Sequence, residues 1–171
     1  MERIRPGAAA DLPDVVEIIN HYVAHTAITF DVVPFTVETR RPWFEQFGPS
    51  GRHRLFVAEQ SGRVVGWACS GPFRSKAAYE TTAETAVYLA PDAVGQGLGS
   101  RLYAQLFEAL AGEDLHRLVA GVTLPNERSI RLHERMGFER VGVFTGVGRK
   151  FDRYHDVAWH ERQARGAPAA G

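Results

Sequence analysis

A run of alternating glycines, Val94-Gly95-Gln96-Gly97-Leu98-Gly99-Ser100, limits the possible folds of this chain more than any other segment. It joins a strand-like segment over 81–89 to a segment over 97–111 in which leucines recur at helical spacing. Glycine lets a backbone approach a ligand closely, and the first turn of a helix offers free N–H groups. The run can therefore hold a pyrophosphate group at a helix N-terminus, or it can be a plain turn between strand and helix.

The spacing of these glycines argues against two common phosphate-binding motifs. In the dinucleotide fingerprint G-x-G-x-x-G, the third glycine would come one residue later than Gly99. A P-loop would need a lysine between Gly99 and Ser100. A nucleotide-binding module is therefore disfavoured.

The remaining pattern predicts an α/β fold with a mixed, mostly antiparallel sheet. Strands are expected over 4–5, 55–59, 64–70, 81–89, 118–122, 139–144 and 151–159, and helices over 12–23, 36–47, 97–111 and 126–136. Asp11 is expected to cap the first helix, and Pro42 weakens the second. An antiparallel meander comes first and a β-α-β unit follows, so helices should cover the sheet. We expect one domain over 1–163 and a flexible tail over 164–171.

Composition narrows the function classes. The 171 residues are 44% hydrophobic and carry 20 basic and 20 acidic side chains, so there is no electrostatic case for binding nucleic acid or an anionic membrane. The apolar runs are far shorter than the ~20 residues of a membrane span, and the N-terminus lacks a signal-peptide core. The single cysteine, Cys69, fits a reducing cytoplasm. The seven histidines have no zinc-site spacing, so no metal is expected.

Several ordered runs together resemble one family. The glycine loop follows Val87-Tyr88-Leu89, and the downstream segment Asn126-Glu-Arg-Ser129-Ile-Arg-Leu-His133-Glu-Arg-Met-Gly137-Phe138 is similar to a second CoA-binding segment. Further runs support this likeness: Ile19-Asn20-His21-Tyr22, Ala78-Tyr79, Thr82-Ala83-Glu84, Gly97-Leu98-Gly99-Ser100-Arg101-Leu102-Tyr103, Leu124-Pro125-Asn126 and His155-Asp156-Val157. With them, the chain from about residue 3 to 160 resembles the GCN5-related N-acetyltransferase (GNAT) family, in particular its phosphinothricin/methionine sulfoximine N-acetyltransferase branch.

This resemblance implies an acetyl-CoA-dependent N-acetyltransferase fold and a small amino acid, or an analogue, as the amine acceptor. It also implies a cytoplasmic homodimer and, for some members, a role in herbicide resistance. The implied acetyl-CoA-binding residues are Val87, Tyr88, Leu89, Val94, Gly95, Gln96, Gly97, Leu98, Gly99, Ser100, Asn126, Ser129 and His133. The family usually carries Arg or Gln where this chain has Val94, so one side-chain contact to CoA is expected to be missing. Alternatives are another amine, such as a polyamine or a protein N-terminus, or a non-catalytic acetyl-CoA sensor.

Glu84 is the candidate general base. It is the only acid in the strand over 81–89, on the same face as Thr82, Ala86 and Tyr88. A substrate amine with a pKa of roughly 8–10 is mostly protonated at pH 7 and must lose a proton before it attacks a thioester. In the resembled branch the glutamate of Thr-Ala-Glu takes this role. The alternative is a solvated edge residue or a structural ion pair.

Asn126, Ser129 and His133 share one helical face, which suits the amides of a pantetheine arm. The other reading is an N-cap at Asn126 followed by solvent-facing residues. His133 stands where many relatives carry a tyrosine near the departing sulfur. It is therefore a candidate acid or second base, the alternative being a histidine that is simply satisfied in the surface or core.

The acceptor site is implied by the resemblance alone. Its cations would be Arg74 and Lys76, its apolar wall Phe30 and Tyr79, and His155 would approach the same cleft. The alternative is a solvated loop with ordinary charges. The order Arg-x-Lys is the reverse of the Lys-x-Arg typical of the branch, which leaves the acceptor's identity open. We expect direct attack in a ternary complex, with Cys69 only packing. The resemblance implies that the backbone N–H of Leu89 holds the oxyanion.

Overall fold

The computed structural model describes residues 2–164, which form one seven-stranded sheet with helices on both faces. The strand order is β1-β2-β3-β4-β5-β7-β6, and only the β4–β5 pair is parallel. The strands are β1 Glu2–Pro6, β2 Arg54–Gln60, β3 Arg63–Pro72, β4 Thr82–Leu89, β5 Arg117–Thr123, β6 Glu139–Lys150 and β7 Arg153–Gln163. The α-helices are α1 Leu12–His25, α2 Val37–Phe44, α3 Leu98–Leu110 and α4 Glu127–Arg135. The expected mixed α/β class is confirmed.

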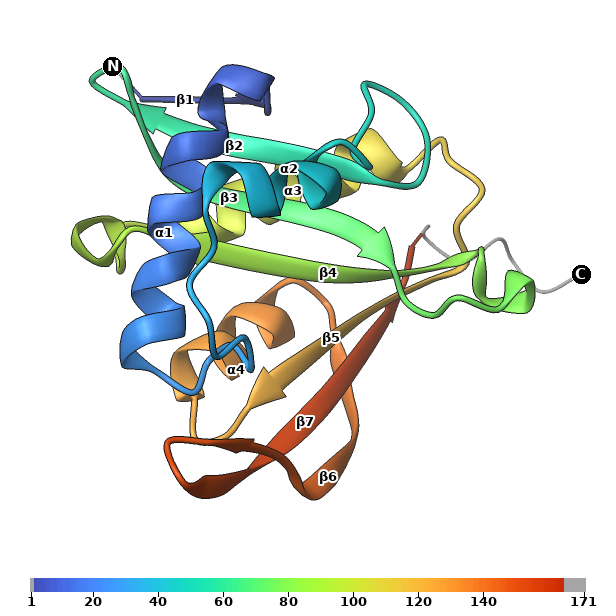
Figure 1. Ribbon diagram of the computed structural model, residues 1–171. Coiled ribbons are helices and arrows are strands. Elements are labelled where there is room, and N and C mark those ends of the chain that lie inside the picture. The colour runs from blue at the N-terminus through green and yellow to red at the C-terminus, as the bar shows by residue number, and fades with distance from the viewer. Residues whose placement is uncertain (1, 165–171) are drawn as a thin grey trace, which may run out of the picture.

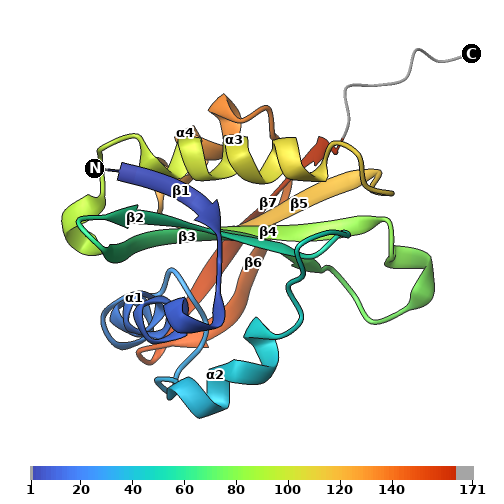
Figure 2. The same cartoon turned by 90° about the horizontal axis from the view of Figure 1, so that it is seen from above.

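The helices make two layers around the sheet. Helices α3 and α4 cover one face, and α1 and α2 cover the other (Figure 2). The apolar stripe predicted for α3 is fully buried against the sheet through Leu98, Leu102, Leu106 and Leu110. On the opposite face, Val15, Ile19 and Val23 of α1 are buried in the same core cluster. None of the helices in residues 2–164 is long and apolar enough to cross a bilayer.

The parallel pair β4–β5 opens along its length. Thr82, Ala83 and Glu84 pair with Arg117, Leu118 and Val119, and the pairing ends there. Beyond Glu84 the two strands diverge, as Figure 1 shows between β4 and β5. Strand β5 continues on β7, whereas β4 continues on β3, so the sheet contains a V-shaped gap near its centre.

Two helix predictions need correction. Asp11 does occupy the N-cap of α1, but its side chain makes no cap hydrogen bond. Its carboxylate instead accepts from the Ala8 N–H at 2.7 Å and from the Arg5 guanidinium at 2.7 and 2.8 Å. The second helix spans Val37–Phe44 rather than 36–47. Thr36 caps it, and Pro42 lies inside it. Because proline has no N–H to donate, this short helix lacks one backbone hydrogen bond and ends earlier than predicted.

The last two strands are longer than predicted, and their turn lies later. The expected strand break after Phe144 is a change of register around Gly146, whose N–H donates to Asp156 Oδ1 at 2.7 Å. Phe151 does not begin a strand. It forms the turn with Asp152, and both have positive φ values, 51° and 56°. The predicted tail over 164–171 lies outside the described residues except for Ala164, which is buried and donates its N–H to the His116 carbonyl at 3.1 Å.

Candidate functional site

Three neighbouring cavities surround the gap between β4 and β5. We call them the α4 groove (about 410 Å³), the junction cavity (about 120 Å³) and the Phe30 cavity (about 500 Å³). Ile28 and Tyr88 line all three. The α4 groove lies between β4 and α4, and the Phe30 cavity lies toward β6 and β7. The junction cavity shares Glu84 with the Phe30 cavity and shares Asn126 and Ser129 with the α4 groove.

The glycine loop forms one end of the α4 groove. Gly95 and Gly97 have φ values of 90° and 75°, a region that residues with a Cβ rarely adopt, and space is open where a Cβ would stand. Gly97 is the N-cap of α3, so the free N–H groups of the first turn face this loop. Gly99 packs closely, because a Cβ there would lie 3.1 Å from Leu132 Cδ2 on α4. This backbone can cradle a pyrophosphate group.

The predicted cofactor residues fall into two sets. Seven of them line the α4 groove: Val87, Tyr88, Leu89, Val94, Gly99, Asn126 and Ser129. Leu98 is fully buried in the core and can offer only its backbone. Gln96 is exposed, and its side chain hydrogen-bonds to neighbouring surface residues. Its Nε2 donates to the Asp92 carbonyl at 3.0 Å, and its Oε1 accepts from Gln60 at 3.3 Å.

The α4 residues meet as the sequence predicts. Asn126 Oδ1 accepts the Ser129 N–H at 3.2 Å, which confirms the N-cap. Asn126, Ser129 and His133 all line the junction cavity. The predicted polar stripe is therefore directed inward, toward the gap between the strands.

His133 has a defined protonation state. Its Nδ1 lies 2.8 Å from the Ser129 carbonyl oxygen, which can only accept, so Nδ1 carries a proton. Burial lowers the pKa of His133 to about 4, and the neighbouring His160, whose ring stacks at 5.8 Å, adds to that shift. The imidazole is therefore neutral near pH 7, and its bare Nε2 accepts the O–H of Tyr103 at 3.0 Å.

Glu84 stands where the strands separate, and it lines both the junction cavity and the Phe30 cavity. Its side chain is partly buried, and this burial raises the pKa of the carboxyl group above its usual value. The positive charge of Arg74 acts in the opposite direction. A carboxylate with a raised pKa beside a cavity has the properties of a general base.

The segment over 26–35 roofs the Phe30 cavity through Ile28, Thr29 and Phe30. The Phe30 ring occupies the space above Gly148, because a Cβ at Gly148 would lie 2.1 Å from Phe30 Cε2. The buried Lys150 donates from Nζ to the Thr29 carbonyl at 2.8 Å. Asn20 of α1 makes two 2.8 Å hydrogen bonds with the backbone of Phe35 and so anchors the other end.

The predicted acceptor residues do not all meet. Phe30 and Arg74 line the Phe30 cavity. Tyr79 lies in a neighbouring groove, and Lys76 is exposed and lines none of the cavities described. His155 does not line the Phe30 cavity but contacts residues that cover it. Its ring packs against Phe30 at 6.2 Å, and its Nε2 lies 3.1 Å from the Lys150 carbonyl oxygen.

Sequence reasoning missed several residues of these cavities. They are Tyr22, Ile28, Thr29, Tyr103, Phe144, Val147, Trp159 and the α4 arginines Arg128 and Arg131. Ile28, Thr29, Phe144, Val147 and Trp159 lie outside the runs that resemble the family, whereas the other four lie within them. Tyr103 ends one of those runs, but a tyrosine on the buried side of α3 is usually core.

Comparison with known proteins agrees with this geometry. The model of the acetyltransferase (GNAT) family matches residues 19–138. A phosphinothricin N-acetyltransferase of Streptomyces coelicolor is 54% identical over 94% of this chain and 95% of its own length. An L-methionine sulfoximine/L-methionine sulfone acetyltransferase of Pseudomonas aeruginosa is 35% identical over 91% of each chain.

A solved structure has the same architecture. The phosphinothricin acetyltransferase from Sinorhizobium meliloti, in complex with AcCoA, superposes with a TM-score of 0.90 and 29% identity, over 99% of this chain and 92% of that chain. The family match covers well over half of the chain, and the relatives are similar along nearly their whole length. The chain belongs to the GNAT family of acetyltransferases.

Proposed function

We propose that the protein transfers the acetyl group of acetyl-CoA to the α-amine of a small amino acid or analogue, of the phosphinothricin or methionine sulfoximine type. One observation carries this proposal. A carboxylate with a raised pKa, Glu84, lies in a junction cavity between a groove that suits CoA and a second cavity that suits an amine acceptor. The names of the relatives support the acceptor class.

The α4 groove is the proposed acetyl-CoA site, and its residues fit that group. The backbone around Gly95 and Gly97, together with the first turn of α3, would hold the pyrophosphate. Asn126 and Ser129 would face the amides of the pantetheine arm. When bound, acetyl-CoA supplies an acetyl group activated as a thioester.

The Leu89 N–H is suited to the carbonyl oxygen of that thioester. The neighbouring Ala90 N–H donates to the Val65 carbonyl at 2.8 Å, on the β3 side. Successive N–H groups of a strand point to opposite sides, so the Leu89 N–H is directed toward the gap left by β5. A donor at this position stabilises negative charge on the oxygen when the amine attacks.

Glu84 is the proposed general base, acting directly or through a water molecule. It takes a proton from the acceptor ammonium group, and the free amine then attacks in a ternary complex. Cys69 takes no part, because it is buried and burial raises the pKa of its thiol to about 12.

His133 and Tyr103 are proposed as a positioning pair. Near neutral pH, His133 holds its one ring proton on Nδ1 against the Ser129 carbonyl, and its Nε2 is occupied by Tyr103. It therefore has no proton ready for donation. The pair fixes the wall of the junction cavity beside Asn126 and Ser129.

The acceptor's anionic group would be held by Arg74, which lines the Phe30 cavity and has no ion-pair partner within residues 2–164. Cytoplasmic location and homodimer formation belong to the same proposal. Among the described residues no cluster of His, Cys, Asp or Glu could hold a metal ion.

The decisive experiment is an acceptor panel with acetyl-CoA and detection of the released thiol. Phosphinothricin, methionine sulfoximine, methionine sulfone and plain amino acids should be acetylated, and Glu84→Gln should abolish most of the turnover. Spermidine serves as the polyamine control. Binding of CoA without turnover of any amine would favour the acetyl-CoA sensor and reject the proposal.

A further inference from the structure

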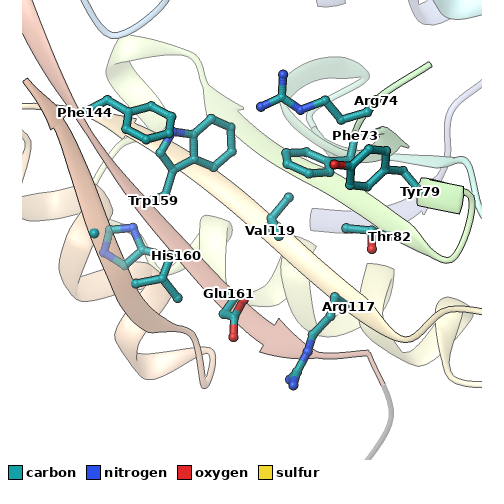
Figure 3. A pocket seen from close by; sticks show the side chains of 12 residues that line it. Phe73, Arg74, Tyr79, Thr82, Arg117, Val119, Phe144, Trp159, His160 and Glu161 are labelled. Atoms are coloured by element: carbon teal, nitrogen blue, oxygen red, sulfur yellow. The ribbon is translucent and has the colours of Figure 1, made fainter. Parts of the chain in front are cut away.

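A fourth cavity, about 370 Å³, runs beside the Phe30 cavity. We call it the Trp159 groove. Val119 forms its floor, Phe144 and Trp159 stand on one side, and Phe73 and Tyr79 stand on the other (Figure 3). Arg74, Phe144 and Trp159 line both this groove and the Phe30 cavity, so the two spaces are adjacent.

The groove combines an apolar interior with charge at its ends. Arg74 and Arg117 lie at opposite ends of it (Figure 3), and neither forms an ion pair within the described part of the chain. Glu161 also lines the groove, which leaves a net positive charge. The surrounding rings pack against one another: Phe73 lies 5.6 Å from Tyr79 and 5.9 Å from Trp159. Such a site favours an apolar group that carries a carboxylate.

We propose that the Trp159 groove is an extended acceptor subsite, which binds the second residue of a short peptide when that residue is apolar. This inference rests on the proposed function, because it takes the Phe30 cavity as the acceptor site. The peptide's free α-amine lies at Glu84, its second side chain lies against Val119 and Trp159, and its terminal carboxylate is drawn to the arginines. The chemistry is unchanged: Glu84 takes one proton from the ammonium group, a C–N bond forms and the C–S bond of acetyl-CoA breaks. The second proton lost by the nitrogen passes to the departing sulfur, so CoA leaves as the thiol.

The position of the groove next to the Phe30 cavity, and the charge at its ends, distinguish this occupant from others. A purely apolar partner surface would leave Arg74 and Arg117 without counter-charge, whereas a peptide carboxylate provides one.

The test compares three acceptors: the best free amino acid from the panel, its dipeptide with glycine and its dipeptide with phenylalanine. The wild-type enzyme should show a kcat/KM for the phenylalanine dipeptide about tenfold above that for the glycine dipeptide. Val141→Trp should fill the groove from β6, because Val141 lines the groove but not the Phe30 cavity. This variant should bring the ratio of the two dipeptides close to one and leave the free amino acid within about twofold.

Val33→Trp is the matched control, because Val33, like Val141, is an exposed valine and its side chain lines none of the four cavities. It should leave the dipeptide ratio unchanged. Equal kcat/KM for the two dipeptides in the wild type would overturn the inference. So would a Val141→Trp enzyme that keeps its ratio but changes its sedimentation mass, since the groove would then be an interface between copies. Failure of the proposed function is separate, because it would appear as no turnover of any free amino acid.

Discussion

The phenolic oxygen of Tyr103 lies 3.0 Å from Nε2 of His133, and both side chains are buried. The pair joins α3 to α4 beneath the gap where β4 and β5 separate. Since His133 Nδ1 donates to the Ser129 carbonyl, the Tyr103 hydroxyl is the group that hydrogen-bonds to the second ring nitrogen, Nε2. The orientation of the imidazole therefore depends on a residue that the sequence did not single out for the site.

Tyr103→Phe should lower kcat about tenfold and leave the acceptor KM within about twofold, because the junction wall loses its fixed geometry but the acceptor cavity does not. The free energy of unfolding should fall by about 1 kcal/mol for the lost hydrogen bond. Steady-state kinetics and urea unfolding measure the two effects. A kcat equal to that of the wild type would remove the pair from the proposed mechanism.

Acid should destabilise the protein through His133. Its pKa is about 4 when folded and about 6.5 when unfolded, so the unfolded chain binds the proton first as the pH falls. The free energy of unfolding therefore has its full value above pH 6.5 and falls as the pH drops toward 4. The fall between pH 6.5 and 5 is about 2 kcal/mol. His133→Gln, which keeps an acceptor for Tyr103, should lack this part of the pH dependence in urea titrations. An identical pH dependence in the variant would contradict the assignment.

The acid limb of the rate profile should report Glu84. Burial raises the pKa of Glu84. On acidification, kcat/KM should therefore begin to fall at a higher pH than it would if the base were an exposed glutamate. Arg74→Gln should move this limb to still higher pH, because the charge of Arg74 lowers that pKa. Lys76→Gln is the matched control, since Lys76 is exposed and lines neither cavity that Glu84 lines. A limb that keeps its position in Arg74→Gln and in Glu84→Gln would exclude Glu84 as the base.

Gly148→Ala should disturb the roof of the Phe30 cavity. The new methyl would lie 2.1 Å from Phe30 Cε2, so the ring must move. We expect the acceptor KM to rise about fivefold while the Kd for acetyl-CoA stays constant, because the α4 groove does not involve Gly148. Gly142→Ala, where space is open, is the control. A raised Kd for acetyl-CoA with an unchanged acceptor KM would contradict the assignment of the Phe30 cavity to the acceptor and of the α4 groove to acetyl-CoA.

Val94→Arg should strengthen CoA binding. Val94 lines the α4 groove beside the glycine loop, where a guanidinium could contact the pyrophosphate. Isothermal titration should show a Kd about three- to tenfold lower at low salt, and the gain should shrink as salt screens the charge. Val94→Gln separates charge from size. An unchanged Kd for CoA at low salt would mean that the backbone N–H groups alone bind the pyrophosphate.

The sequence predicted the parts of the site that depend on local pattern. The glycine loop, the Asn126 cap and the inward face of α4 follow from short-range rules of turns and helices. Strand ends were less predictable. The pattern predicts a strand that stops at Phe144, yet tertiary pairing carries β6 on to Lys150.

Long-range contacts could not be predicted from the sequence. Lys150 reaches the Thr29 carbonyl across 121 positions, and Phe30 covers Gly148. Lys76 and Arg74 are two residues apart in a loop, and only the folded loop shows that one lines the cavity and the other does not. Neither distinction leaves a periodic signal in the chain.

The divergence of β4 from β5 has a consequence for how such a protein can change over generations. The α4 groove is lined mainly by the end of β4, the glycine loop and α4, whereas the Phe30 cavity is lined mainly by the 26–35 segment, β6 and β7. Ile28 and Tyr88 are the residues that these two linings share. Substitutions that retune one side therefore leave most of the other intact, so a lineage can adopt a new acceptor while keeping its acetyl donor.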